Sequence, residues 1–296
     1  MTIPTVFGAS LIVFLLIRVI PGDPAVLLAG EDAEPLVVES LRKEWGLAEP
    51  LTTQYLVFVR NILQGNLGVS LSSNYPVSHE ISLRLPSTML LTLLAMMIAT
   101  VAGLSIGIFS STRPYSLADN FTTTLSLVGV SAPVFWTALA LMYLFAVKLG
   151  WLPAIGSGSL RHLVLPSLTL AAFATPEIAR QTRSSMLEVL RQEYIRTARS
   201  KGLREIAVVY RHAVRNALIP VITVIGFILG RMLGGSIVTE TVFSYPGMGK
   251  LLVDAIFMRD YPVIQGTILV YSLLFVFVNV LVDAMYAYVD PRIQYK

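Results

Sequence analysis

Residue types that catalyse reactions or bind metals are scarce in this sequence and poorly placed for either role. The three histidines, His79, His162 and His212, are far apart, and there is no cysteine. Zinc and nickel sites use histidine, cysteine or acidic ligands at short, regular spacings, which these histidines lack. No Gly-x-Ser-x-Gly sequence and no pair of acids within an apolar stretch indicates a hydrolase. The sequence therefore predicts no catalytic residue and no metal site.

One short sequence is similar to part of a nucleotide site. Gly247-Met248-Gly249-Lys250 resembles the end of a phosphate-binding loop. However, Ser244 stands where that loop has its first glycine, and Leu251 replaces the Ser or Thr that binds magnesium. We therefore expect no ATP site, no cofactor and no enzymatic activity in this chain itself.

The most informative segment is the polar stretch from 184 to 216. Apolar or small side chains recur in it at helical spacing: Leu187, Leu190, Tyr194 and Ala198. Gly202 follows, and glycine commonly ends helices because it adopts the left-handed conformation. The pattern predicts a short amphipathic helix within 184–216, ended by Gly202. Such a helix either docks into a groove of a cytoplasmic partner or lies on the anionic inner leaflet.

The composition places this segment in a membrane protein. Hydrophobic residues make up 55% of the 296, charged residues 14%, and the mean hydropathy is +0.71. Soluble domains carry roughly 25% charged residues. The apolar residues form blocks of about twenty, the length that crosses a bilayer as a helix. We expect an all-α integral membrane protein with about six transmembrane helices, near 2–20, 88–110, 121–148, 164–183, 217–240 and 265–289, with a kink or tilt at Pro133.

The charges of the loops predict the orientation. Residues 180–216 contain nine basic and three acidic residues, whereas residues 21–87 contain four basic and eight acidic ones. Because basic loops stay in the cytoplasm, 184–216 is predicted to be cytoplasmic, with both termini on the same side. The positive charge then needs no nucleic-acid partner.

The predicted outer regions contain further helices. Residues 1–20 are expected to be a retained first span rather than a cleaved signal peptide, with a few basic residues missing from its start. Residues 21–87 are expected to form a small helical cap, with helices over 35–45 and 51–62, the second ended by Gly65. The alternative is an amphipathic segment lying on the membrane surface. Another short re-entrant or interfacial helix is expected between 241 and 264.

Several motifs resemble one family of transporters. The string Glu193-Tyr194-Ile195-Arg196-Thr197-Ala198-Arg199-Ser200-Lys201-Gly202-Leu203 resembles the "EAA" loop of ABC importer permeases, in the form used by the dipeptide, oligopeptide and nickel branch. Arg196 and Thr197 depart from the general pattern, as in that branch. The other matching strings are 85–88 (Leu-Pro-Ser-Thr), 211–220, 240–249, 259–265 and 290–292 (Asp-Pro-Arg).

The resemblance implies a transport subunit with defined partners. Residues 88–296 would be the permease core, and 188–205 the coupling helix that contacts an ATP-binding subunit. Its contact residues would be Glu193, Tyr194, Arg196, Thr197, Ala198, Lys201 and Gly202. The implied partners are a second homologous permease, one or two cytoplasmic P-loop ATPases that bind ATP and magnesium, and an extracytoplasmic solute-binding protein. The implied location is the cytoplasmic (inner) membrane of a bacterium or archaeon.

Two features within the predicted fifth span indicate a packed transporter. Gly226, Gly230 and Gly234 recur at every fourth residue and predict close helix contact. Arg231 lies among them, and a charge at that depth should face protein or water. Arg231 and Glu240 are therefore candidates to line the pathway, with Arg231 binding a carboxylate or carbonyl of a peptide. Alternatively, Arg231 pairs structurally with an acid such as Asp283 or Glu240, or with one on the partner. Glu177 and Arg180 are expected to form an interfacial pair.

The solute expected from the resemblance is a di- or oligopeptide. A nickel chelate, glutathione or an opine are alternatives within the same family. Two other classes, a gradient-driven secondary transporter and a membrane enzyme, leave the coupling loop unexplained. The first also predicts an inverted repeat, which the sequence does not show, and titratable residues along the spans, of which clear buried acids are few.

Overall fold

The computed structural model describes residues 2–19, 25–26, 34–44 and 46–289. Helices dominate this part of the chain, and its only β-type pairing is one bridge between Val69 and Pro76. The chain divides into two compact units. Unit 1 comprises residues 1–87 and 247–276, and unit 2 comprises residues 88–246 and 277–296. Two long helices, α5 (Val77–Thr112) and α13 (Tyr261–Val289), contribute to both units.

Unit 1 contains the short helices predicted for the outer regions. Its first helices are α1 (Thr2–Val19), α3 (Pro35–Glu44) and α4 (Leu51–Leu63), and α12 covers Met248–Phe257. These bounds confirm the helices expected near 35–45 and 51–62 and within 241–264. Phe14 of α1 packs edge-on against Tyr55 of α4, with ring centroids 5.2 Å apart. Val77 and Met248, both fully buried, belong to the core that joins α5 to α12.

Asp260 joins two loops of unit 1 and immediately precedes α13. Its carboxylate accepts hydrogen bonds from the Ser70 hydroxyl at 2.6 Å and from the Ser72 hydroxyl at 3.0 Å. The other carboxylate oxygen accepts from the backbone N–H of Val263 at 3.4 Å, a contact typical of a helix cap. Asp260 is 1% exposed, so water cannot replace these contacts.

Replacing Asp260 with Asn should lower the free energy of unfolding by about 1–2 kcal/mol. An amide offers a single oxygen, so it cannot accept from the serines and from Val263 at once. Thermal unfolding of the full chain in detergent measures the change. The matched control is Asp254→Asn, because Asp254 pairs with Lys250 within one helix at half-buried positions that water still reaches, and this pair should contribute under about 0.5 kcal/mol. If the two variants lower the free energy of unfolding equally, Asp260 does not stabilise the connection between its two loops.

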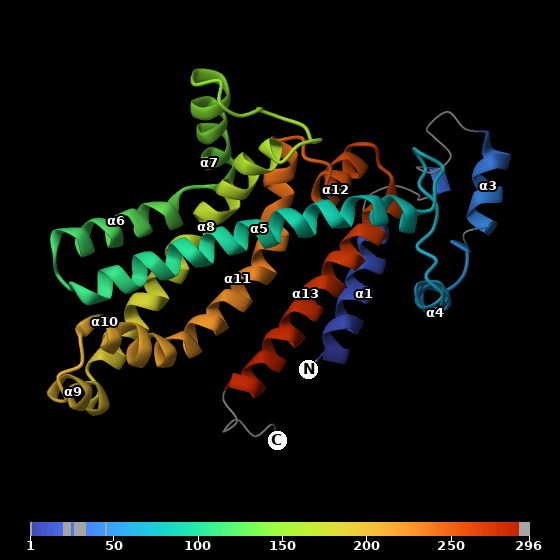
Figure 1. Cartoon of the computed structure of the whole chain (residues 1–296). Coiled ribbons are helices and arrows are strands. Elements are labelled where there is room, and N and C mark those ends of the chain that lie inside the picture. The colour runs from blue at the N-terminus through green and yellow to red at the C-terminus, as the bar shows by residue number, and fades with distance from the viewer. Residues whose placement is uncertain (1, 20–24, 27–33, 45, 290–296) are drawn as a thin grey trace. The chain divides into compact units, whose positions relative to one another are not determined.

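Unit 2 is a bundle built around α8 (Arg161–Leu190) and α11 (Val214–Val242). These two helices lie side by side in Figure 1 and pack closely along their lengths. Its core includes Leu91 of α5, Leu165 and Ile178 of α8, and Met232 of α11, all fully buried.

Glycines let helices of unit 2 approach closely. A Cβ at Gly103 of α5 would lie 2.7 Å from the Ile178 side chain, and one at Gly129 would lie 2.9 Å from Pro176. Gly226 of α11 contacts Val282 of α13 so closely that a Cβ would overlap it. Gly230 is buried, whereas a Cβ at Gly234 would meet nothing within 4 Å. Of the predicted glycine stripe, Gly226 therefore makes a close helix contact and Gly234 borders open space.

Four helices of the described chain are long and apolar enough to span a membrane: Val77–Thr112, Arg161–Leu190, Glu205–Val242 and Tyr261–Val282. Two shorter apolar helices, Pro4–Leu15 and Val134–Lys148, lie at the remaining predicted spans. The predicted span over 121–148 is interrupted at Pro133, the residue where a kink or tilt was expected. Helix α6 (Leu117–Ser131) stops before Pro133, and α7 (Val134–Leu141) continues into a π-helical segment, η1 (Met142–Lys148). Proline has no N–H to donate and disfavours helical backbone in the residue before it, which explains the break.

Candidate functional site

The predicted amphipathic helix exists, but its limits and phase differ from the sequence prediction. Helix α8 continues from the span to Leu190, and the extended residue Gln192 (ψ 148°) separates it from α9 (Glu193–Ser200). Because of this break, Leu187 and Leu190 belong to another helix, and the predicted stripe is not continuous. On α9, Ile195 is fully buried and Ala198 is 7% exposed, whereas Tyr194 is 41% exposed. Gly202 has a φ of +76°, as expected for a residue that ends a helix.

Helix α9 is fixed to unit 2 through its apolar face and two polar contacts. Ile195 and Ala198 share a core with five buried residues of neighbouring segments: Met186, Val208, Val209, Ala213 and Ala217. The Arg199 guanidinium donates to Glu205 at 2.6 Å, and the Asn216 amide donates to the Tyr194 hydroxyl at 2.7 Å. These contacts join α9 to α10 (Glu205–Ala207), to the π-helical segment η2 (Val208–Ala213) and to α11.

The outward face of α9 carries most of the predicted contact residues. Five of them are exposed: Glu193, Tyr194, Arg196, Thr197 and Lys201. The other two have structural positions, since Ala198 contributes to the core and Gly202 forms the terminating turn. In this arrangement the buried face of α9 packs against the rest of unit 2, and its exposed polar face is accessible to a partner surface.

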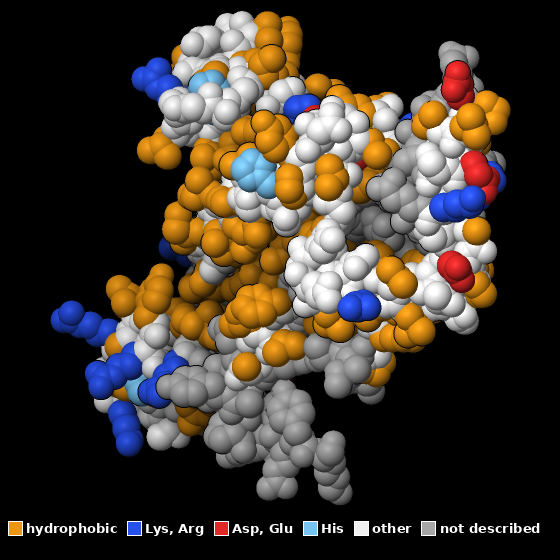
Figure 2. Space-filling view, turned by 90° about the vertical axis from the view of Figure 1, so that its right-hand side faces the viewer, with side chains coloured by type: hydrophobic (Ala, Val, Ile, Leu, Met, Phe, Trp, Pro, Cys, Tyr) orange, Lys and Arg blue, Asp and Glu red, His pale blue; other side chains and the backbone are white. Residues whose placement is uncertain are grey.

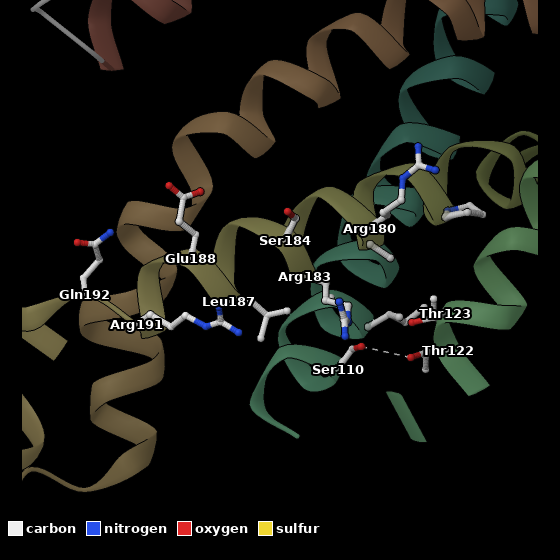
Figure 3. Close-up of a pocket in the computed structure, with 14 residues that line it drawn as sticks. Ser110, Thr122, Thr123, Arg180, Arg183, Ser184, Leu187, Glu188, Arg191 and Gln192 are labelled. Atoms are coloured by element: carbon white, nitrogen blue, oxygen red, sulfur yellow. Dashed lines mark hydrogen bonds between the residues drawn. The ribbon is translucent and has the colours of Figure 1, made fainter. Parts of the chain in front are cut away.

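A pocket of about 650 Å³ lies along the C-terminal half of α8 and ends at Gln192 (Figure 3). Helices α5, α6 and α8 form its walls, and Arg180, Arg183 and Arg191 contribute its positive charge. In Figure 3, Arg183 extends toward Ser110 of α5, and Arg191 extends back along α8 toward Leu187. The pocket thus lies between the end of α8 and the hairpin that joins α5 to α6.

Arg183 connects that hairpin to α8 through Asp119. Its guanidinium donates two hydrogen bonds to the Asp119 carboxylate, each 2.7 Å long. The same carboxylate accepts from the Ser110 hydroxyl and from the backbone N–H of Tyr115 at 2.8 Å. The Arg183 hydrogen bond, followed by those of Ser110 and Tyr115, outweighs the opposing effect of burial and holds the pKa of Asp119 well below its usual range.

Replacing Asp119 with Asn should lower the free energy of unfolding by about 2 kcal/mol, because the bidentate contact with Arg183 is lost. A carboxyl whose pKa is depressed by folding stabilises the protein above its unfolded pKa of about 4, and this contribution disappears as the pH falls toward the folded pKa. The difference in free energy of unfolding between wild type and variant should therefore stay constant from pH 7 to about pH 5 and shrink only in stronger acid. Thermal unfolding across pH measures it, and a gap that closes before pH 5 would contradict the assignment.

The charged residues within the spans are arranged differently from the sequence prediction. Arg231 of α11 pairs with Glu177 of α8, so Glu177 does not pair with Arg180. The Arg231 guanidinium also lies 5.8 Å from the centre of the Phe173 ring. Glu240 is fully buried and accepts a hydrogen bond from Thr88 at 2.7 Å. The side chain of Asp283, proposed as an alternative partner of Arg231, lies outside the described part of the chain.

Sequence reasoning missed several residues that shape this region. Asp119 and Arg183 are 64 positions apart, and no local pattern links them. Gly103 and Gly107 of α5 are also four positions apart and pack against α8. The same small-residue spacing that identified Gly226 and Gly230 could have identified this glycine pair.

Comparisons with known proteins agree with this arrangement. Residues 99–295 match the family described as "Binding-protein-dependent transport system inner membrane component", and residues 2–92 match its N-terminal companion family. The glutathione transport system permease protein GsiC of Pectobacterium atrosepticum is 48% identical over 99% of this chain and 96% of its own length. GsiC of Escherichia coli K12 is 45% identical over the same shares.

Two solved structures have a similar fold. The methionine ABC transporter MetNI in an inward-facing conformation gives a TM-score of 0.60 at 20% identity, covering 71% of this chain and 96% of its own. An amino acid ABC transporter crystallised with histidines gives a TM-score of 0.58 at 15% identity, covering 71% of this chain and 94% of its own. At these identities the likeness concerns the fold alone.

Proposed function

This chain belongs to the family of binding-protein-dependent transport system inner membrane components, which are ABC importer permeases, and from that premise we propose that it forms half of a pathway whose opening is driven by partner ATPases. As a multi-pass inner-membrane protein it provides the route for the solute. ATP and magnesium bind to one or two cytoplasmic P-loop ATPase subunits. A second homologous permease supplies the other half of the pathway.

Helix α9 is the observation that carries this proposal. Its exposed polar face is available to an ATPase groove, and its buried face contacts the ends of α8 and α11. A displacement of α9 by the ATPase would therefore move these two helices, which form the centre of unit 2. The bidentate Asp119–Arg183 contact extends the same displacement to the α5–α6 hairpin. Glu193, Tyr194, Arg196, Thr197 and Lys201 make the partner contacts in this proposal.

The charge distribution supports a cytoplasmic position for α9 and for both termini. Figure 2 shows Lys and Arg side chains gathered at the lower end of unit 2, at the height of α9 and α10 in Figure 1, below a broad hydrophobic surface. Basic segments next to spans remain on the cytoplasmic side. The acidic segment 21–87 and the region around α12 then face outward, where a solute-binding protein docks.

Glutathione is the solute that the relatives favour. Both named permease relatives are described as parts of glutathione transport systems, and they align with nearly the whole chain. Glutathione is a tripeptide, and it is one of the alternatives to a di- or oligopeptide that the sequence left open within the family. Nickel chelates and opines are the remaining alternatives within the family.

The test is reconstitution of the tagged chain with the proteins that copurify from its native membrane. We expect a second permease and P-loop ATPases in the purified complex, and uptake of glutathione into liposomes that requires ATP and the binding protein. Parallel assays with a dipeptide and a nickel chelate identify the solute. A chain that purifies alone and moves solute without ATP would contradict the proposal.

A further inference from the structure

The Glu177–Arg231 pair occupies an unusual position for charged side chains. Both residues lie near the middle of their helices, α8 and α11, which are candidate spans. The pair is nevertheless accessible, with 49% of the Arg231 side chain and 32% of the Glu177 side chain exposed. Charges at that depth are tolerated only where they face protein or water, so this surface of α8 and α11 cannot face lipid.

The exposed surface of α5 provides the comparison within the same unit. Between residues 90 and 101 every exposed residue of α5 is apolar, namely Leu90, Leu93, Met97 and Val101. This is the composition that acyl chains require. On α11, by contrast, the exposed residues between Phe227 and Val238 are the charged Arg231 and the side-chain-free Gly234. The two exposed surfaces therefore differ in the environment they suit.

The geometry around Arg231 leaves room and free hydrogen-bonding capacity for a ligand. The described contacts use one guanidinium nitrogen, Nη2, for Glu177, while the Phe173 ring lies beside the guanidinium. The remaining N–H donors can hold a second carboxylate. Gly234 lies one turn along α11 from Arg231, and no atom comes within 4 Å of the position of its missing Cβ.

We propose that Glu177 and Arg231, with Phe173 beside them and Gly234 leaving space, form a binding subsite in a water-filled pathway for the charged ends of a zwitterionic solute. Arg231 holds a carboxylate of the solute, and Glu177 accepts a hydrogen bond from its ammonium group. The inference rests on the proposed function, because that function supplies the pathway. It identifies the solute class by chemistry, as a small molecule carrying both a carboxylate and an ammonium group.

Because the chain has no cysteine, a single introduced thiol can report on this surface. The variant Gly234→Cys is tolerated sterically, since no atom lies near the new Cβ. In the complete complex we expect it to react with a charged, membrane-impermeant thiol reagent. The control Met97→Cys, on the apolar surface of α5, should stay unlabelled. If Gly234→Cys is as unreactive as Met97→Cys, the surface is covered by protein or lipid and the proposal is wrong.

Protection by a solute tests the role of Arg231. The probe is S-methylglutathione, whose blocked thiol does not consume the reagent. It should slow the labelling of Gly234→Cys about tenfold, and adding Arg231→Gln should remove this protection. The matched control is Arg113→Gln, because Arg113 lies over the Phe109 ring at 5.6 Å and has no acidic partner among the described residues. Protection that survives Arg231→Gln, or that Arg113→Gln also removes, would overturn the proposal.

A charge swap separates solute binding from a purely structural pair. The double variant Glu177→Arg/Arg231→Glu keeps the ion pair but reverses its polarity. If the pair only stabilises the helices, the double variant should take up solute at the wild-type rate. We expect its uptake to be at least about tenfold below the wild-type rate. A wild-type complex that does not import glutathione contradicts the proposed solute, whereas the labelling of Gly234→Cys still decides whether the pair faces water.

Discussion

Replacing Ile195 with Asp abolishes ATP-dependent uptake in a reconstituted complex, whereas replacing Ile206 with Asp leaves most of it. Ile195 is fully buried beneath α9, in the core that includes Met186 and Val209. An unpaired carboxylate there costs several kcal/mol, because Ile195 packs in a core of apolar side chains. An eight-residue helix has little stability of its own and depends on this packing. We therefore expect α9 to detach from unit 2.

The control places the same substitution on an exposed isoleucine nearby. Ile206 is 74% exposed on α10, so Ile206→Asp adds the same charge without burying it. Uptake, the ATPase rate and the amount of ATPase that copurifies should be measured together. Loss of uptake with continued ATP hydrolysis would show that α9 transmits movement, and loss of the ATPase from the complex would show that it also holds the partner. Equal uptake by the two variants would remove α9 from the coupling mechanism.

The helices of this protein could largely be predicted from sequence because their signals are local. Apolar blocks, the spacing of Leu51 to Ile62 and the glycines after helices depend on neighbouring residues only, and α3, α4 and α12 lie where they were expected. The break at Gln192 could not be predicted, because the residues around it are ordinary helix formers. Beyond the break, Ile195 of α9 packs in one core with Met186 of α8 and Val209, a long-range contact that no local pattern records.

The charged contacts could not be predicted for a different reason. Glu177 has Arg180 one turn away, so sequence spacing favoured that pair, while its partner in the structure is Arg231, 54 positions distant. Such a choice depends on how α8 and α11 are rotated against each other. That rotation follows from the close packing of residues such as Ile178 and Met232, which no local pattern records.

Replacing Gly107 with Ala should lower the free energy of unfolding by about 2–3 kcal/mol and reduce uptake. A Cβ at Gly107 of α5 would lie 2.7 Å from the backbone carbonyl oxygen of Ala179 and within the Thr182 side chain. A backbone oxygen cannot rotate away, so α5 and α8 must separate along their length. Arg183, the next residue of α8, then moves away from Asp119, and the connection between α8 and the α5–α6 hairpin weakens.

The matched control is the same substitution at Gly235. A Cβ there would meet Leu170 at 3.7 Å, an ordinary contact, and Ala is a better helix former than Gly. Gly235→Ala should therefore be neutral or slightly stabilising in thermal unfolding of the full chain in detergent. If Gly107→Ala were equally neutral, α5 and α8 would have to be separable without cost, and the hairpin could not follow the movement of α8. If Gly107→Ala is destabilised and its uptake falls by more than the loss of folded protein explains, the close contact between α5 and α8 itself transmits the movement from α9 toward the pathway.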